Sequence, residues 1–289
     1  MSRSKRIWAA LAAASCIYAA GPVDFGMAEL NAAIAARNLK FKPKIVAELN
    51  TDPPETFRID PYSSGGGRVS GGDLRGLMYG LLEAAAQMRT LGHLKLTRAS
   101  PFLSPRSVKA SADPSVSWFG SEDFWRAYLA VLARDRFDRL QLVFDRFPDR
   151  SAFPALRTIS QTAMQYGVDI ALGLRSFSPE SRSALQDLLT QSMGIRAVVF
   201  AGANEPEKFP IVDVLAKTGR RVVLDDSRLW QIDPAQGGLD EEGIRSAVSA
   251  LTGGFEVASS LGSQAVGQWG RLGYDPTPPK PPPATKRLR

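Results

Sequence analysis

The chain has 289 residues, of which 44% are apolar, so it is long enough to bury a substantial core and to form two domains. The net charge of +7 is scattered, with part of the excess at the two ends, so we expect no nucleic-acid partner. One cysteine and one histidine exclude an intrachain disulfide, a cysteine-based metal site and a two-histidine zinc site. A Ser-His-Asp triad would depend entirely on His93, just past a predicted helix, and we expect neither a metal nor a cofactor.

Residues 1–20 have the features of an export signal. Basic residues precede an apolar, alanine-rich run from Ile7 to Ala20, which is too short to span a bilayer comfortably. The run Ala13-Ala-Ser-Cys16 resembles a lipoprotein box, in which Cys16 would become the lipidated first residue and give the chain its membrane attachment. We therefore expect a bacterial protein that is periplasmic, envelope-anchored or secreted. An ordinary secretory peptide and a buried N-terminal helix are the alternatives to lipidation.

Residues 25–97 are predicted to form a small α+β domain. Helical spacing extends from Met27 to Leu39, and short strands are predicted at 44–49 and 56–59. A glycine-rich link then leads to 68–70, the expected partner in a β-hairpin.

The strongest helix of the first half follows Asp73, which is placed to cap its exposed amides. Its apolar residues recur with a period that puts them on one face. They are Leu74, Leu77, Met78, Leu81, Leu82, Ala85 and Met88. Gly76 and Gly80 lie one turn apart, so they allow this helix to approach a sheet closely.

Residues 98–117 contain Pro101, Pro105 and Pro114 among serines and charged residues, and they are predicted to be an extended linker. From 118 to 274, short apolar strands alternate with amphipathic helices. The strands are predicted at 140–144, 168–172, 195–200, 221–224 and 255–257, and the helices at about 154–166, 179–191, 207–217 and 240–251. Such alternation indicates parallel strands with crossover helices, in a barrel or a doubly wound sheet. The proline-rich tail, 275–289, is predicted to be extended and mostly disordered.

Three segments resemble bacterial α-glucuronidases and family 20 β-hexosaminidases. Gly72-Asp73, Arg75-Gly76 and Tyr79-Gly80 are similar to the turn and helix that end the small accessory domain of those enzymes. Phe124 to Leu140 resembles the helix that leads into their first barrel strand, and Trp269 to Pro276 resembles a segment well beyond the middle of the barrel. The resemblance covers residues 40 to 276 approximately. It implies an α/β protein with an accessory domain followed by a (β/α) barrel-like domain, abbreviated here to about five strands.

Glycoside hydrolysis generally uses two carboxyl groups, and barrel enzymes carry such groups at the C-terminal ends of their strands. On this basis we predict Glu205, Asp225 and Asp226 as the catalytic acids. The resemblance places Asp225-Asp226 where a hexosaminidase carries an Asp-Glu pair with glutamate as the general acid. The second residue is aspartate in this chain, shorter by one methylene, and one of the pair capping a helix is the alternative.

Four further residues are predicted to bind substrate: Asp145, Arg175, Asn204 and Trp230. Arg175 would pair with a sugar carboxylate through two hydrogen bonds, although an arginine at a strand end is also a common ion-pair partner. Trp230, in an exposed-looking loop, would stack on a sugar ring.

Two functions follow from this interpretation. The first is an exported glycoside hydrolase-like protein acting on a uronic-acid or amino-sugar linkage of an oligosaccharide or polysaccharide. The second is a non-catalytic relative that binds glycans, or only keeps the fold, without hydrolysis. A nucleotide-binding domain is disfavoured because no Gly-x-Gly-x-x-Gly follows a predicted strand.

Overall fold

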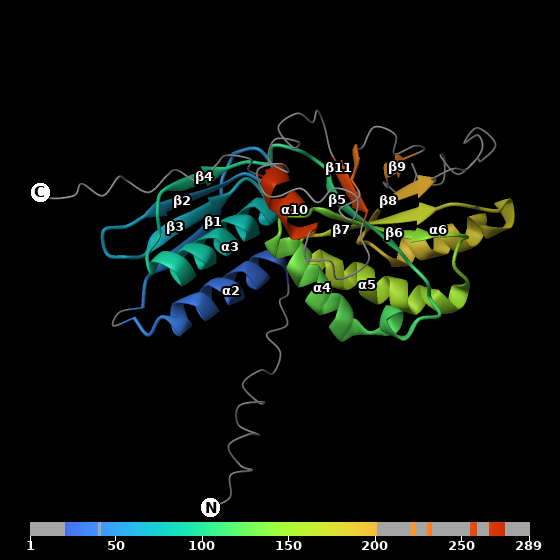
Figure 1. Cartoon of the computed structure of the whole chain (residues 1–289), viewed down its shortest axis with the longest axis horizontal. Helices are drawn as coiled ribbons and strands as arrows, with labels where there is room; N and C mark the ends of the chain where they lie inside the picture. Colours follow the sequence, from blue (N-terminus) through green and yellow to red (C-terminus); the bar gives the residue numbers. More distant parts are fainter. Residues whose placement is uncertain are drawn as a thin grey trace, which may run out of the picture.

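The computed structural model of the chain describes residues 21–39, 42–200, 221–223, 230–232, 255–258 and 266–274. These residues form a four-stranded mixed sheet in the first third of the chain and a seven-stranded parallel sheet in the rest (Figure 1). The protein is therefore of the α/β class, with an N-terminal module followed by a barrel-like domain, as predicted. In the described ranges, no helix combines the length and apolarity needed to cross a membrane.

The N-terminal module has two helices on one side of the mixed sheet (Figure 1). Its strand order is β1-β3-β2-β4, with β1 parallel to β3 and the other pairs antiparallel. The elements are α2 (Pro22–Ala36), β1 (Ile45–Leu49), β2 (Phe57–Pro61), β3 (Gly67–Gly71), α3 (Leu74–Leu91) and β4 (Thr97–Ala99). The predicted hairpin is the antiparallel pair of β2 and β3.

Helix α3 begins and packs as its sequence predicts. The Asp73 carboxylate accepts a hydrogen bond from the backbone N–H of Gly76 at 2.6 Å, which satisfies one of the free amides of the first turn. A Cβ atom at Gly76 would lie 2.4 Å from the carbonyl oxygen of Thr56, and one at Gly80 would lie 2.8 Å from Val69 Cγ1. Both glycines are therefore required for the close contact between helix and sheet.

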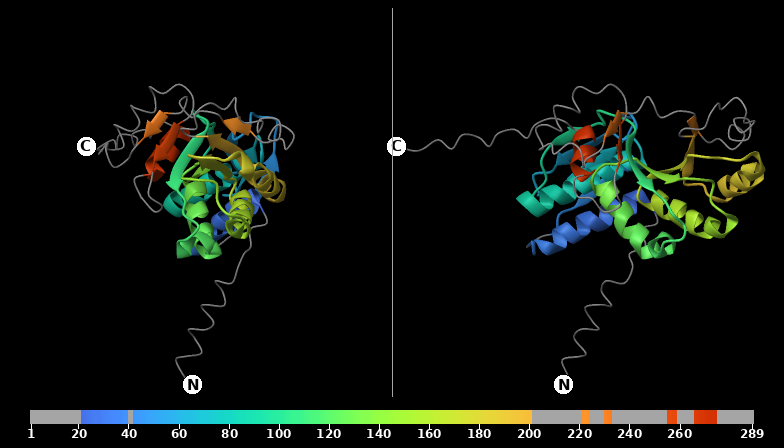
Figure 2. Two further views of the ribbon diagram at one scale, coloured as in Figure 1. Left: turned by 90° about the vertical axis from the view of Figure 1, so that its right-hand side faces the viewer. Right: turned by 45° about the vertical axis from the view of Figure 1, so that its right-hand side comes forward.

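The second sheet is parallel throughout and has the order β10-β11-β5-β6-β7-β8-β9. Its strands are β5 (Arg106–Ser111), β6 (Arg139–Phe144), β7 (Asp169–Leu174), β8 (Ile195–Phe200), β9 (Arg221–Val223), β10 (Trp230–Ile232) and β11 (Phe255–Ala258). The last strand pairs with the first, as in a closed barrel, and the two edges, β9 and β10, are consecutive in the chain. The strands curve around a common axis, which gives a partial barrel (Figure 2).

Helices cover the outside of this sheet and bury its main core (Figures 1 and 2). They are η1 (Ser117–Gly120), α4 (Glu122–Arg134), η2 (Arg150–Ala152), α5 (Phe153–Gln165), η3 (Pro179–Ser181), α6 (Arg182–Gln191) and α10 (Val266–Tyr274). Alternate strand residues, among them Leu140, Leu142 and Phe144 of β6, point outward into this core. The intervening residues therefore point into the barrel.

The structure differs from the sequence prediction in three places, the first of which is β4, a strand that the sequence did not predict. Residues 98–117, predicted as an extended linker, contain β5, which is a central strand of the barrel sheet. Its residues Arg106–Ser111 include only two apolar side chains, so the alternation of apolar and polar residues typical of a strand is weak. The prolines that suggested a linker flank the strand and do not interrupt it. Trp230 begins strand β10 and does not lie in a loop. The barrel strands that the sequence did not predict, β5 and β10, raise the barrel count from five to seven.

Candidate functional site

The C-terminal ends of β5, β6 and β7 surround a cavity of about 620 Å³. Because all strands of the sheet are parallel, these ends lie at the same edge, which is the edge that carries catalytic groups in barrel enzymes. Polar groups reach the cavity from each of the three strands. Asp113 follows β5, Asp145 and Arg146 follow β6, and Arg175 follows β7.

Two of the predicted substrate-binding residues are brought together at this cavity. Arg175 Nη1 lies 2.7 Å from Asp145 Oδ1, and the two side chains are 58% and 85% exposed. The loops that carry them are also joined, since the Ser176 hydroxyl donates to the Asp145 carbonyl oxygen at 2.8 Å. An ion pair so open to solvent contributes little to stability, so Arg175 can exchange Asp145 for the carboxylate of a ligand.

Asp113 is a site residue that the sequence interpretation missed. Its Oδ1 accepts a hydrogen bond from the backbone N–H of Ser115 at 2.8 Å, and this bond lowers the pKa of Asp113 below its ordinary value. The residue therefore faces the cavity as a carboxylate. Two features of the sequence could have indicated this strand and the acid after it. Apolar and polar residues alternate briefly around Val108 and Ala110, and Asp113-Pro114 is typical of a turn that ends a strand.

Trp118 supplies an aromatic wall to the same cavity. It packs against the rings of Phe124 and Trp125, at centroid distances of 5.1 and 5.8 Å. Trp125 itself is buried and donates its indole N–H to the carbonyl oxygen of Phe119 at 2.8 Å, so its role is packing. Trp118 is thus held in place by its neighbours and presents an aromatic side chain to the cavity.

The structure does not describe the side chains of the remaining predicted site residues. Asn204, Glu205, Asp225 and Asp226 lie outside the described residues, and Trp230 is placed only by its backbone in β10. The catalytic role of Glu205, Asp225 and Asp226 therefore stays a prediction. His93 lies exposed beyond α3, with its Nδ1 3.2 Å from the carbonyl oxygen of Leu91, and takes no part in the cavity.

Below the cavity, the interior of the barrel carries a buried amide. Gln141 is paired in register with Lys109 on β5 and with Ala171 on β7. Its side chain is fully buried, and among the described residues neither its oxygen nor its nitrogen finds a hydrogen-bond partner. Gly173 lies beside it, since a Cβ at this position would be 3.1 Å from the Gln141 Nε2. On the β7 side, the small residues Ala171 and Gly173 therefore flank this buried amide.

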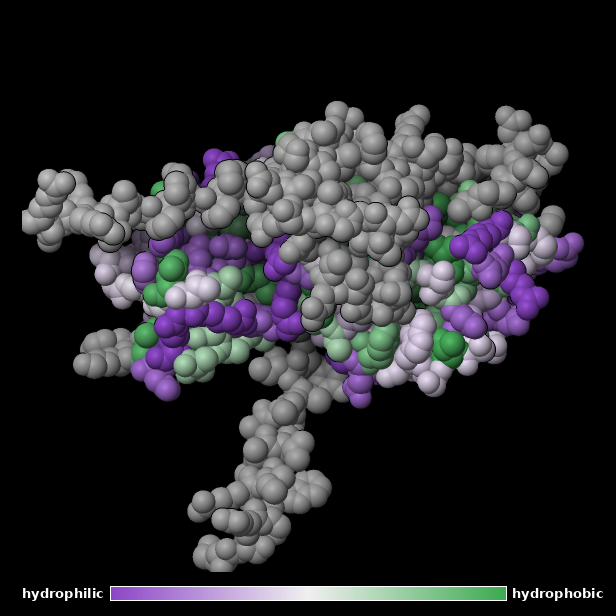
Figure 3. Space-filling view, viewed as in Figure 1, coloured by the Kyte–Doolittle hydropathy of each residue, from purple (hydrophilic) through white to green (hydrophobic). Residues whose placement is uncertain are grey.

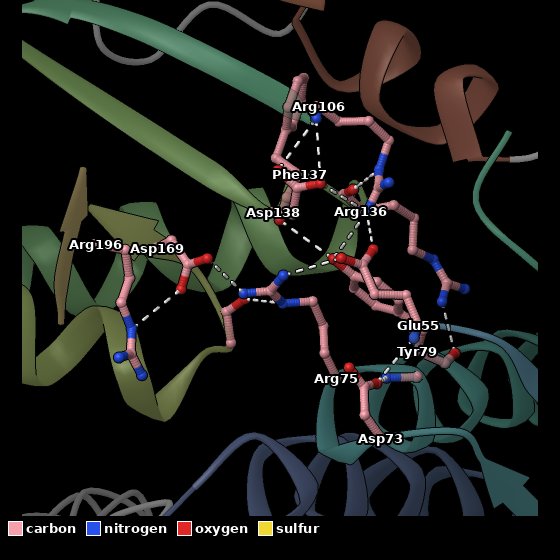
Figure 4. A network of polar contacts seen from close by, with 12 residues as sticks. Glu55, Asp73, Arg75, Tyr79, Arg106, Arg136, Phe137, Asp138, Asp169 and Arg196 are labelled. Carbon is pink, nitrogen blue, oxygen red and sulfur yellow. Dashed lines mark hydrogen bonds and ion pairs between the residues drawn. The ribbon is translucent and has the colours of Figure 1, made fainter. Parts of the chain in front are cut away.

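A buried ionic network occupies the opposite end of the strands and joins the two modules (Figure 4). Arg106, the first residue of β5, has its Nη2 2.5 Å from Glu55 Oε2 and 3.3 Å from Asp138 Oδ2. Glu55 also binds Arg75, whose Nη1 lies 2.9 Å from its Oε1. Arg75 in turn reaches Asp169 at the start of β7, at 3.2 Å.

The charges of this network are strongly perturbed by burial. Burial alone would raise the pKa of Glu55, but the Arg106 and Arg75 guanidinium groups outweigh it and hold that pKa below its ordinary value. Burial prevails at Asp138 and raises its pKa, although Arg106 acts in the opposite direction. Burial also raises the pKa of the Tyr79 hydroxyl to about 12. Neutral Tyr79 is therefore maintained at any physiological pH.

The charged groups of this network are paired with one another or with backbone carbonyl oxygens. The strand-end cavity is therefore the candidate site. Besides Glu55, Arg106 donates to the carbonyl oxygens of Arg136 and Leu103, each at 2.7 Å. Tyr274 of α10 completes the junction, with its ring 6.0 Å from that of Phe57. In barrel proteins, residues at the N-terminal ends of the strands stabilise the fold, whereas residues at the C-terminal ends bind the substrate and catalyse the reaction.

Comparison with known proteins supports the fold at low sequence identity. No protein-family model matches the sequence, and no curated protein matches it either. Among solved structures, a GH138 enzyme targeting pectin rhamnogalacturonan II superposes with a TM-score of 0.61 at 12% identity, over 89% of this chain. A GH115 4-O-methyl-α-glucuronidase with specificity for decorated arabinogalactans gives 0.59 at 11% identity, over 90% of this chain. A glycoside hydrolase family 20 β-N-acetylglucosaminidase gives 0.51 at 13% identity, over 82%.

The fold of this chain therefore resembles that of these glycoside hydrolases. The chain spans 62% of the length of the GH138 enzyme, 56% of the GH115 enzyme and 69% of the family 20 enzyme. At such identities the likeness concerns the fold, and the chemistry has to be argued from the residues of this chain.

Proposed function

We propose that the chain acts on a carbohydrate at the C-terminal ends of its barrel strands and hydrolyses a glycosidic bond next to a uronic acid or an amino sugar. The observation that carries the proposal is the polar cavity formed by Asp113, Asp145 and Arg175 at that edge of a glycoside hydrolase-like fold. The exposed guanidinium of Arg175 suits a sugar carboxylate, and Trp118 offers a ring face beside it.

The catalytic acids in this proposal follow the next two strands. Glu205 comes five positions after the end of β8, and Asp225 and Asp226 come two and three positions after the end of β9. Because segments that follow parallel strands leave from the same edge of a sheet, we expect these acids at the edge that carries Asp145. One carboxyl group would protonate the leaving oxygen, and the other would act as nucleophile or base, or would orient a substrate amide that does so.

The test is turnover of aryl glycosides and of glucuronoxylan oligosaccharides by the purified protein and three variants, Glu205→Gln, Asp225→Asn and Asp226→Asn. Loss of a catalytic carboxyl group should lower kcat by roughly 10²- to 10⁴-fold. Asp60→Asn is the matched control, because Asp60 forms an ion pair with Arg58 on the remote N-terminal sheet. Absence of turnover by the parent protein, or equal turnover in all variants, would contradict hydrolysis.

Binding without hydrolysis is the second candidate, and one observation favours it. The carboxylates that the structure describes at this cavity, Asp113, Asp145 and Asp149, are all exposed, which suits ligand binding better than general acid catalysis in a dry pocket. The same oligosaccharides would then bind without being cleaved. We expect Trp118→Ala and Trp230→Ala to weaken that binding, and affinities equal to the parent's in both would argue against a sugar site at this edge.

We further propose that the chain is exported through residues 1–20 and anchored by a lipid at Cys16. The proposal rests on the basic start, the apolar run and the lipoprotein-like Ala13-Ala-Ser-Cys16. Expression in a bacterial host followed by fractionation tests it. The parent chain should partition with membranes and a Cys16→Ala variant should be released; cytoplasmic retention of the parent would overturn export.

A further inference from the structure

A second cavity, of about 460 Å³, lies at the junction of the two modules. Its walls come from α3, β2 and β4 of the N-terminal module, and from the end of α4 and from α10 of the barrel domain. The end of α4 precedes β6, so this cavity is at the opposite end of the strands from Asp145. Hydrophilic and hydrophobic side chains are interspersed over the visible surface of the N-terminal module in the space-filling view (Figure 3).

Four arginines line the junction cavity, and they outnumber the carboxylates that pair with them. Arg89 and Arg134 share a single carboxylate, Glu29, at 2.6 and 2.7 Å. Two further pairs bring Arg136 to Glu83 and Arg271 to Asp135, at 3.3 and 3.7 Å. Among the described residues, four guanidinium groups therefore face three carboxylates, which leaves one positive charge in excess.

Arg271 is the least committed of the four. Its 3.7 Å separation from Asp135 is too long for a hydrogen bond, and its side chain is 58% exposed. Burial raises the pKa of the Asp135 carboxyl, although Arg271 acts to lower it. Asp135 is therefore a weak ion-pair partner for Arg271. Among the described residues, Asp135 is the carboxylate paired with this guanidinium, and a guanidinium has five N–H donors with which to bind a ligand in the cavity.

Arg136 lines the cavity with a guanidinium group that is held in a fixed position. Its Nη1 donates to the carbonyl oxygen of Tyr79 at 2.6 Å, and its guanidinium carbon lies 5.5 Å from the Phe57 ring centroid and 5.4 Å from that of Tyr274. The side chain is buried, so it is held in place before any ligand arrives. A preorganised cation loses little conformational entropy on binding an anion.

We propose that the junction cavity binds an oxyanion, a phosphate, sulfate or carboxylate group of a small ligand, with Arg271 as its principal ligand and Arg89 and Arg134 at the rim. Guanidinium groups bind these anions through paired, charge-assisted hydrogen bonds. The anion would neutralise the excess charge and would contact both modules at once. The site is independent of the carbohydrate site proposed at the strand ends.

Calorimetric titration of the full chain with inorganic phosphate, sulfate and glucuronate tests the proposal, with glucose as the neutral probe and sodium chloride holding ionic strength constant. We expect saturable binding of at least one anion and no binding of glucose at this cavity. Arg271→Gln should raise Kd by roughly tenfold or more, since a hydrogen bond to a charged group is lost. The anion that binds most tightly distinguishes an inorganic ion from a sugar acid.

Two control variants test whether the anion binds at the junction cavity or elsewhere on the protein. Arg68→Gln removes an arginine of similar exposure, 51%, whose partner Glu48 is 3.4 Å away on the N-terminal sheet, and should leave Kd unchanged. Arg196→Gln, which removes a barrel-domain arginine that is 51% exposed and 4.0 Å from Asp169, should also leave Kd unchanged. Absence of saturable binding, equal Kd in Arg271→Gln and the parent, or loss of binding in Arg196→Gln would each overturn the junction site. Urea unfolding of every variant verifies that it is folded.

Discussion

Replacing Glu55 with glutamine should remove the central anion between the two modules while keeping the shape of the side chain. Glu55 holds Arg106 and Arg75 at 2.5 and 2.9 Å, and the Arg106 side chain is fully buried. Glutamine keeps one acceptor oxygen but turns an NH₂ group toward a guanidinium. Arg106 would be left with Asp138, at 3.3 Å, as its remaining carboxylate among the described residues.

The expected loss is large because the pair is buried. Removing one partner of a buried ion pair destabilises a protein by about 3–5 kcal/mol, and the Glu55 side chain, 11% exposed, is little screened by water. The exposed pair of Arg58 and Asp60, 50% and 30% exposed, contributes at most ~1 kcal/mol. Asp60→Asn is therefore the matched control, on the strand that follows Glu55.

Urea unfolding followed by circular dichroism measures both variants. With a slope of about 2–3 kcal/mol per molar, the midpoint of Glu55→Gln should fall by ~1–2 M. A fall equivalent to less than about 1 kcal/mol, or equal falls for the two variants, would refute the reasoning that the network holds the modules together.

The same comparison has a defined pH dependence. The pKa of Glu55 is lowered in the folded state, so its stabilisation is complete above the unfolded pKa of about 4.3 and is lost as the pH falls through the lower folded value. The difference between the parent and Glu55→Gln should be constant from about pH 7 to about pH 5 and should narrow below about pH 4. Asp138 has a raised pKa, and the Glu55 charge contributes to that rise, so Glu55→Gln should also bring the pKa of Asp138 closer to its ordinary value.

Three further variants test other features of the structure by the same unfolding measurement. Gly76→Ala should destabilise by about 1–3 kcal/mol or more, because its Cβ would lie 2.4 Å from the Thr56 carbonyl oxygen; an unchanged midpoint would contradict the close packing of α3. Gln141→Leu should be neutral or stabilising by ~1–2 kcal/mol, because it removes a buried amide whose atoms find no partner among the described residues; a clear loss of stability would reveal a partner for that amide. Arg175→Gln should change stability by less than about 1 kcal/mol, since its pair with Asp145 is exposed, and a larger loss would identify Arg175 as a structural ion-pair partner.

The charged residues at the two ends of the barrel strands have different surroundings. Arg106, Asp138 and Asp169 lie at or just before the starts of β5, β6 and β7, and their charges are used in contacts with the N-terminal module and its neighbours. At the other end, the charges of Asp145 and Arg175 face solvent and a cavity. This separation is the reason that the proposed chemistry is assigned to the C-terminal edge.

Features with a local cause were predictable from the sequence. The capping of α3 by Asp73 depends on residues three positions apart, and the glycine spacing of 76 and 80 follows one helical turn. The parallel alternation of β6, β7 and β8 with helices was read from the periods of their apolar residues. Asp145 and Arg175 were found because they follow strong strands.

Other features were decided by tertiary structure alone. Strand β5 has too few apolar residues to be recognised, and it becomes a central strand because β6 and β11 pair with its two sides. Asp113 was missed with it. The ion pair of Glu55 and Arg106 joins residues 51 positions apart, and no period in a sequence encodes such a contact. Local periodicity therefore determined the elements and their order, whereas the burial of particular charges and the meeting of strand ends depended on how those elements pack.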